Sequence, residues 1–133
     1  MKKTFIFVSA LFFANSAMAT TDHYFLRDDH HIHHLKITKL NDNVFVSTDV
    51  DFEPNANEAD GKPCSAEIAG EAKTSGENQI SLKKHSHSDA SYCELTIKLS
   101  GEQATIEQSK GCDNFVTGIC HFSSDGKALN KIK

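Results

Sequence analysis

Histidine is the residue type most able to do chemistry in this 133-residue chain, because eight histidines are present and most of them are clustered. Four fall in one five-residue run that directly follows Asp28 and Asp29, and two more share a second short run. Neutral imidazole nitrogens bind Zn²⁺ and Cu²⁺, and a carboxylate oxygen can serve as a further ligand. The candidate metal ligands are His30, His31, His33, His34, His85 and His87.

The backbone around the first histidine run decides which side chains can act together. In an extended strand, residues i and i+2 point to the same side, so we expect His31 and His33 to share one face. His30 and His34 then flank the opposite face, and His85 forms a second pair with His87. Two other interpretations remain open. The run is a solvated polar strand end without a ligand, or it is a cluster that becomes charged when its histidines are protonated at about pH 6.

Short runs of alternating apolar and polar residues recur after the first histidine run, and this pattern is typical of antiparallel strands. The clearest is the run from Cys93 to Leu99, and turn residues such as Asn41-Asp42-Asn43 and Gly101-Glu102 separate the runs. We therefore expect an all-β protein: a small antiparallel sandwich or barrel of six to seven strands with two disulfides.

One of these runs, residues 44–52, carries hydrophobic side chains on both sides. Val44, Val46, Val50 and Phe52 share one face, whereas Phe45 falls on the other. We expect the second face to be covered, as in a sandwich or a closed barrel. The alternative is an exposed hydrophobic patch that contacts a partner.

The even number of cysteines predicts two disulfides, as is typical of short exported proteins; the cysteines are Cys64, Cys93, Cys112 and Cys120. The spacing does not fit the paired short gaps of a zinc site. The register of the predicted hairpins places all four sulfurs at one end of the sheet. We favour Cys64–Cys93 with Cys112–Cys120, and Cys93–Cys112 with Cys64–Cys120 is the next alternative.

The first nineteen residues have the three parts of a secretory signal. Lys2 and Lys3 are basic, residues 5–14 are apolar, and Ala17-Met18-Ala19 supplies the small residues of a cleavage site. The apolar run is shorter than the roughly 20 residues that span a bilayer. We expect a cleavable signal peptide at residues 1–19, a single β domain at 20–133, and a periplasmic or secreted location.

Charge and motifs exclude several classes of function. The formal net charge is −4, and loss of Lys2 and Lys3 makes the chain more acidic. An acidic chain with one arginine is a poor ligand for nucleic acid phosphates, and after cleavage we expect no membrane insertion. Nucleophile, phosphate-loop and dinucleotide motifs are missing from the sequence. We therefore expect no enzymatic activity and no cofactor, unless the histidines bind Zn²⁺ or Cu²⁺.

Residues 92–122 carry a recognisable pattern of cysteine, glycine and aromatic positions. It reads Cys93-Glu-Leu-Thr-Ile, a glycine turn, Ala104-Thr-Ile, then Cys112-x-x-Phe115-x-x-Gly118-x-Cys120-x-Phe122. This pattern resembles the C-terminal half of small, largely uncharacterised secreted proteobacterial β proteins, some of which are similar to periplasmic lysozyme inhibitors. Known inhibitors insert a loop bearing serine and lysine into the enzyme. Here Ser81-Leu82-Lys83-Lys84 matches that loop only loosely, so no residue role is transferred.

These features together favour a non-enzymatic exported binding protein, an inhibitor or immunity-type protein that acts on a cell-wall hydrolase such as lysozyme. It would insert a disulfide-braced loop, residues 85–91 or 112–122, into the cleft of its partner. The candidate partner-binding residues are His85, Ser86, His87 and Phe115. The alternative is a periplasmic zinc- or copper-binding protein that uses the histidine-rich segment, and a structural or adhesin-type surface protein also remains open.

Overall fold

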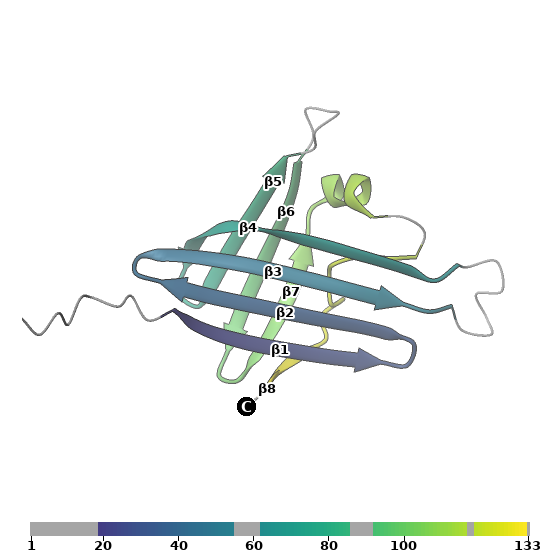
Figure 1. The fold of residues 1–133 in the computed structure, drawn as a ribbon, viewed down its shortest axis with the longest axis horizontal. Helices are drawn as coiled ribbons and strands as arrows, with labels where there is room; N and C mark the ends of the chain where they lie inside the picture. Colours follow the sequence, from purple (N-terminus) through teal and green to yellow (C-terminus); the bar gives the residue numbers. More distant parts are fainter. Residues whose placement is uncertain (1–18, 55–61, 86–91, 117–118, 133) are drawn as a thin grey trace, which may run out of the picture.

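The computed structural model describes residues 19–54, 62–85, 92–116 and 119–132. Eight antiparallel strands, hydrogen-bonded in chain order, form a closed barrel in which β8 pairs with both β7 and β1 (Figure 1). The predicted all-β fold is confirmed, with eight strands rather than six or seven. The elements are β1 (Thr20–Asp28), β2 (His31–Leu40), β3 (Asn43–Phe52), β4 (Cys64–Gly76), β5 (Gln79–His85), β6 (Tyr92–Ser100), β7 (Gln103–Gln108), the 3₁₀ helix η1 (Lys110–Phe115) and β8 (Leu129–Ile132).

The strand that the sequence pattern missed is β1. Its consecutive residues Tyr24, Phe25 and Leu26 are apolar on both faces, so the period-two pattern that identifies a half-buried strand is absent. Tyr24 is buried in the barrel, whereas Phe25 is exposed on the outside. Pairing with β2 and β8, rather than local alternation, therefore makes this segment a strand.

Four two-residue turns connect successive strands, and each contains one residue with positive φ. These residues are Asp29, Asn41, Asn78 and Gly101. Asp, Asn and Gly tolerate the left-handed conformation better than other residues. The turns fix the register of each hairpin, and so determine which side chains lie beside one another across the sheet.

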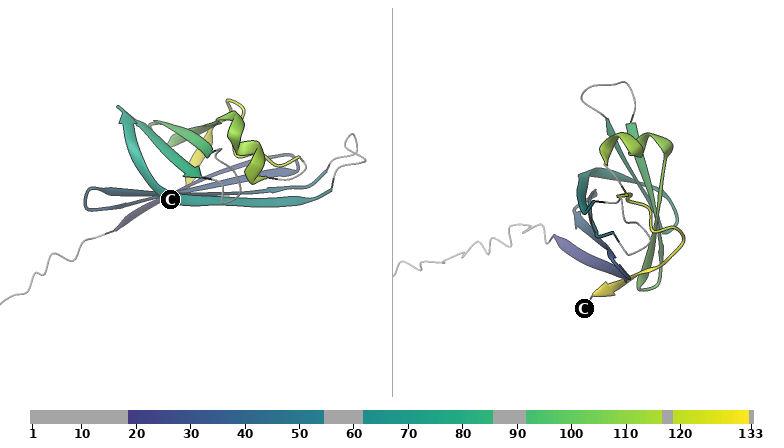
Figure 2. Two further views of the ribbon diagram at one scale, coloured as in Figure 1. Left: turned by 90° about the horizontal axis from the view of Figure 1, so that it is seen from above. Right: turned by 90° about the vertical axis from the view of Figure 1, so that its right-hand side faces the viewer.

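The barrel interior is filled by the alternating apolar residues of the strands. The largest fully buried side chains include Phe52 of β3, Leu82 of β5, Leu95 of β6 and Phe122 of the segment before β8. The long strand β4 joins the two sides of the barrel, because residues 64–72 pair with β3 and residues 72–76 pair with β5. As a result β1–β3 and β5–β7 cross at a steep angle (Figures 1 and 2).

The disulfides are Cys64–Cys120 and Cys93–Cys112, so the pairing that the sequence favoured is wrong and its alternative is correct. The favoured pairing assumed that β4 pairs with β5 along its whole length. In the barrel, residues 64–72 of β4 pair with β3 instead, which places Cys64 away from the β5–β6 hairpin. Both bridges attach the segment between β7 and β8 to the first residues of an even-numbered strand, and in this antiparallel barrel those residues share one end.

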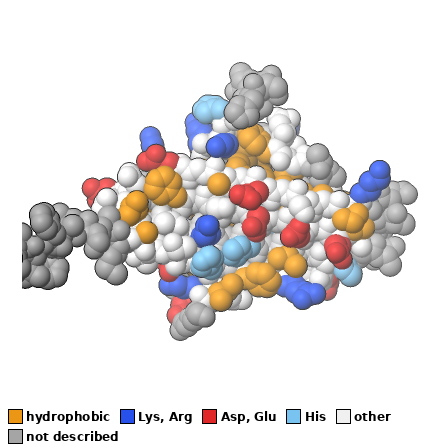
Figure 3. Space-filling model, viewed as in Figure 1, with side chains coloured by type: hydrophobic (Ala, Val, Ile, Leu, Met, Phe, Trp, Pro, Cys, Tyr) orange, Lys and Arg blue, Asp and Glu red, His pale blue; other side chains and the backbone are white. Residues whose placement is uncertain are grey.

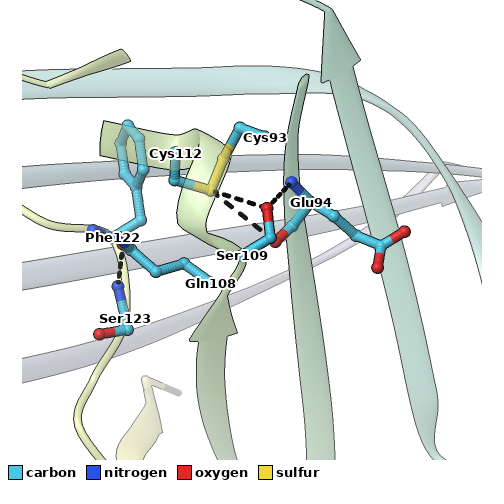
Figure 4. Close-up of a disulfide and its surroundings, with 7 residues drawn as sticks. All are labelled: Cys93, Glu94, Gln108, Ser109, Cys112, Phe122 and Ser123. Atoms are coloured by element: carbon cyan, nitrogen blue, oxygen red, sulfur yellow. Dashed lines mark hydrogen bonds between the residues drawn. A yellow bond between two sulfur atoms is a disulfide. The ribbon is translucent and has the colours of Figure 1, made fainter. Parts of the chain in front are cut away.

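The Cys93–Cys112 bridge lies where η1 returns over β6 (Figure 4). The Glu94 amide donates to Ser109 Oγ at 2.9 Å, and the Ser109 amide donates to the Glu94 carbonyl at 2.9 Å. A Cβ at Gly111 would lie 2.0 Å from the Tyr92 carbonyl oxygen, so only glycine allows this approach. These contacts hold η1 against β6 at the distance that the disulfide requires.

Two disulfides in a chain of this size are typical of an oxidising environment outside the cytoplasm. The predicted signal peptide lies almost entirely outside the described residues, and β1 begins at Thr20. Within the described ranges, the structure contains no helix long and apolar enough to cross a membrane.

Candidate functional site

Strand β2 begins inside the histidine-rich run and distributes its imidazoles between the two faces of the barrel wall. His33 points inward and is buried, and His31 lies on the same inner face at the end of the strand. His34 lies on the outer face, and His30 is exposed in the turn that precedes β2. The structure therefore separates the predicted metal ligands of this run into an inner group and an outer group.

The inner group is built around Phe52, which is the cross-strand partner of His31. The His31 ring stacks on Phe52 with 4.1 Å between centroids, and the His33 ring meets Phe52 edge-on at 5.2 Å. His121 completes the group, with its centroid 5.8 Å from His33 and 6.4 Å from His31. We call His31, His33, Phe52 and His121 the inner cluster.

His121 was not among the predicted site residues because it is far from β2 in the sequence. It follows Cys120, and the Cys64–Cys120 disulfide holds its segment against the start of β4, beside Phe52. Its Nδ1 lies 2.8 Å from the Ser123 carbonyl, and its Nε2 lies 3.4 Å from Asp125. The correct disulfide pairing was therefore the signal needed to place His121 in this cluster.

The buried position of His33 disfavours a positive charge on its imidazole. Burial, together with the nearby His121 and His31, lowers the pKa of His33 from 6.5 to about 4, against the opposing effect of Asp125 and Asp28. Within the described part of the chain, His33 Nδ1 and His31 Nε2 are buried without a hydrogen-bond partner. His33 is 3% exposed, so at neutral pH it is an uncharged imidazole in the barrel core.

The outer histidine of β2 forms a different arrangement, which crosses three strands. His34 Nε2 lies 3.1 Å from Nδ1 of His23 in β1, and the two rings are parallel to within 7°. His34 Nδ1 lies 3.5 Å from an Asp49 carboxylate oxygen in β3. We call His23 and His34 the outer pair. The two-residue turn at Asp29 sets Phe25 opposite His34, so the register places His23 diagonally beside it.

Acidic side chains dominate the middle of the same outer face. Asp49 and Asp51 alternate along β3, and Glu67 of β4 lies directly opposite Asp49 in the register. Within the described residues, none of the three forms an ion pair with lysine or arginine. Figure 3 looks onto this side of the molecule and shows acidic side chains grouped there, with histidines and hydrophobic side chains nearby.

An aromatic side chain lies on this face beyond the acidic residues. Phe45 of β3 is 41% exposed, so the described residues do not cover the outer side of this strand at that position, contrary to the expectation of a covered second face. Phe45 borders a shallow groove of about 320 Å³. The groove is lined by Lys36, Thr38, Phe45, Val46, Ser47, Ala69 and Gly70. We call Phe45, Asp49, Asp51 and Glu67 together the acidic face.

The remaining predicted site residues lie elsewhere. His85 is exposed at the end of β5, with its ring 5.8 Å from that of Tyr92, and β5 pairs with β4 and β6 rather than β2. Phe115 is partly buried against the core, which limits its access to a partner. Ser86 and His87 lie outside the described residues. A second groove near His85 carries both charge signs, with Glu71, Glu94, Lys73 and Lys83 in its lining.

Among the described residues, no group of three or more histidine, cysteine, aspartate or glutamate side chains is arranged to hold a metal ion. The five predicted ligands that the structure describes, all but His87, are thus not brought together as one site. Comparison with known proteins assigns no family: no family model, curated protein or solved structure matches this chain. Its chemistry must therefore be inferred from its own side chains.

Proposed function

We propose that this protein is an exported binding protein, without enzymatic activity, that recognises a basic protein partner through the acidic face. The observation that carries the proposal is the position of Glu67 directly opposite Asp49. Like charges directly opposite one another destabilise a sheet. Among the described residues no lysine or arginine neutralises this pair, and only the His34 imidazole lies beside Asp49, so a positively charged partner would relieve the repulsion.

The exposed side chain of Phe45 supports the same interpretation. Interfaces combine a few buried aromatic anchors with polar groups around them, and Phe45 lies on the same strand as Asp49 and Asp51. All three residues belong to a barrel wall fixed by hydrogen bonds on both sides. Little conformational entropy would be lost there on binding, which favours affinity.

The partner class we propose is a cell-wall hydrolase, with lysozyme as the leading example, met in the periplasm or in the medium. The resemblance of residues 92–122 to secreted inhibitor-like proteins supports this class, and complementary charge would accelerate association with such a basic enzyme. The inhibitor would act by covering the substrate cleft of the enzyme. The acidic face replaces Phe115 as the proposed contact, because Phe115 is partly buried.

The test is inhibition and complex formation with c-, g- and i-type lysozymes and cell-wall amidases at low ionic strength. We expect one of these enzymes to be inhibited, with an association rate that falls as salt is added. Asp51→Asn and Glu67→Gln should each slow association, and Phe45→Ala should accelerate dissociation. Glu77→Gln, which removes one charge from the exposed β4–β5 turn, is the matched control. The proposal fails if no enzyme in the panel is inhibited or bound, or if the control has the same effect as Glu67→Gln.

A further inference from the structure

The outer pair points to a function that the proposed protein partner does not require. We propose that His23 and His34 form a binding site for a divalent transition-metal ion, Cu²⁺ or Zn²⁺, on the outer surface of β1 and β2. The two protein ligands are Nδ1 of His23 and Nε2 of His34. This site differs from the one that the sequence suggested, since only His34 is common to both.

The distance between the two nitrogens is the first argument. Histidine nitrogens lie about 2.0–2.1 Å from Zn²⁺, so two of them around a tetrahedral ion are roughly 3.3 Å apart. Neighbouring nitrogens in a square-planar Cu²⁺ site are closer, at roughly 2.8 Å. The observed separation of 3.1 Å lies between these values. In the absence of an ion the same contact is a hydrogen bond between the two imidazoles, so the ring that donates its N–H would change tautomer when an ion binds.

The neighbouring carboxylate is the second argument. A histidine that binds a metal through one nitrogen usually donates its other N–H to a carboxylate, which fixes the tautomer and makes the ligand more basic. Asp49 lies 3.5 Å from His34 Nδ1, the nitrogen that is not used for the ion. Asp49 would therefore act as a positioning residue, and the negative charge of Glu67 opposite it adds to the attraction for a cation.

Accessibility separates this site from the inner cluster. The unpartnered nitrogens of His31 and His33 are buried in the barrel, and an ion there would lose its hydration without gaining a third ligand. The outer pair lies at the surface, so water can fill the remaining coordination positions. Lys36 lies directly opposite His23 in the register and is exposed. Its positive charge opposes a cation, which predicts moderate rather than tight affinity.

Calorimetric titration of the full chain, expressed with its own N-terminal segment and without an affinity tag, tests the proposal with Zn²⁺ and Cu²⁺ separately. We expect one ion per chain with micromolar affinity, and tighter binding of Cu²⁺ than of Zn²⁺. His23→Gln and His34→Gln should each weaken binding at least about tenfold, and Asp49→Asn about ten- to a hundredfold. Lys36→Met should tighten metal binding, because it removes the positive charge opposite His23. In NMR spectra of the imidazole nitrogens, Zn²⁺ should shift Nδ1 of His23 and Nε2 of His34.

His30→Gln and His85→Gln are the matched controls, since both residues are exposed histidines outside the outer pair. Binding should be unchanged in both. The proposal is overturned if the wild-type chain binds neither ion below millimolar concentration, if the His23→Gln/His34→Gln double variant still binds, or if a control loses binding. Circular dichroism of each variant verifies the fold, and no result depends on a protein partner.

Discussion

The inner cluster and the outer pair take histidines from the same strand, one residue apart, yet their environments are opposite. His33 is enclosed by Phe52, His31 and His121, and one of its nitrogens has no partner. His34 lies on the other side of β2, with His23 hydrogen-bonded to one nitrogen and the Asp49 carboxylate 3.5 Å from the other. Burial makes one imidazole a neutral part of the core, whereas exposure beside a carboxylate leaves the other available for ligands.

A run of histidines in a strand is therefore not one site. Because successive side chains point to opposite faces, a barrel wall divides such a run into two chemically distinct sets. Each set then acquires its remaining members from other strands or segments. His121 joins the inner set through a disulfide, and His23 joins the outer set through a hairpin register.

The largest expected effect comes from removing the bridge that holds His121 in the inner cluster. The Cys64→Ser/Cys120→Ser variant should lose about 4 kcal/mol of stability in the chain-entropy model, against about 3 kcal/mol for Cys93→Ser/Cys112→Ser. Removal of Cys64–Cys120 lowers stability more because this bridge spans 56 residues, whereas Cys93–Cys112 spans 19. Urea unfolding under equal conditions measures both variants. Equal losses would show that the loop length does not control their contributions.

The next effect is acid destabilisation through His33. In the unfolded chain the His33 imidazole is protonated as the pH falls through its ordinary pKa of 6.5. In the folded chain its pKa is about 4, so it is protonated only near that pH. The contribution of neutral His33 to the free energy of unfolding is therefore fully present above about pH 6.5 and is lost as the pH falls toward about 4. The loss between pH 7 and pH 4 should be roughly 3 kcal/mol, measured by urea unfolding at several pH values. His33→Leu should remove this part of the pH dependence; an unchanged profile would refute the assignment to His33.

A smaller effect should separate the two faces of β2 at neutral pH. His33→Leu removes a buried nitrogen that has no hydrogen-bond partner, so we expect it to stabilise the protein by about 1 kcal/mol. His34→Leu, on the outer face, should change stability by less than about 0.5 kcal/mol. Chemical unfolding at pH 7 compares the stabilities of the two variants directly. A marked loss of stability in His33→Leu would mean that its polar nitrogens contribute to the fold.

The smallest effect concerns the acidic face beside the outer pair. Glu67→Lys replaces the like-charge pair with Asp49 by an opposite-charge pair, and should stabilise the barrel by a few tenths of a kcal/mol. The same substitution should weaken binding of a basic partner. Thermal unfolding and association kinetics measure the two changes together. If stability falls, or binding is retained, the like-charge pair has no role in recognition.

Several features of this protein could be predicted because they depend on local pattern. The alternation in residues 44–52 and 93–99 indicates strands, and the even number of cysteines indicates two disulfides. The same period-two geometry places His31 and His33 on one face of β2. Each of these conclusions needs only neighbouring residues in the sequence, and the structure agrees with them.

The remaining features depend on contacts between segments that are distant in the sequence. Barrel closure made β1 a strand despite its weak alternation, and the change of partner along β4 selected Cys64–Cys120 over Cys64–Cys93. That bridge brought His121 to His33, while the register of β1 on β2 brought His23 to His34. The amino-acid sequence alone determined which groups could do chemistry. The closed barrel determined which of them meet, because long-range pairing, unlike local alternation, leaves no periodic signal in one segment.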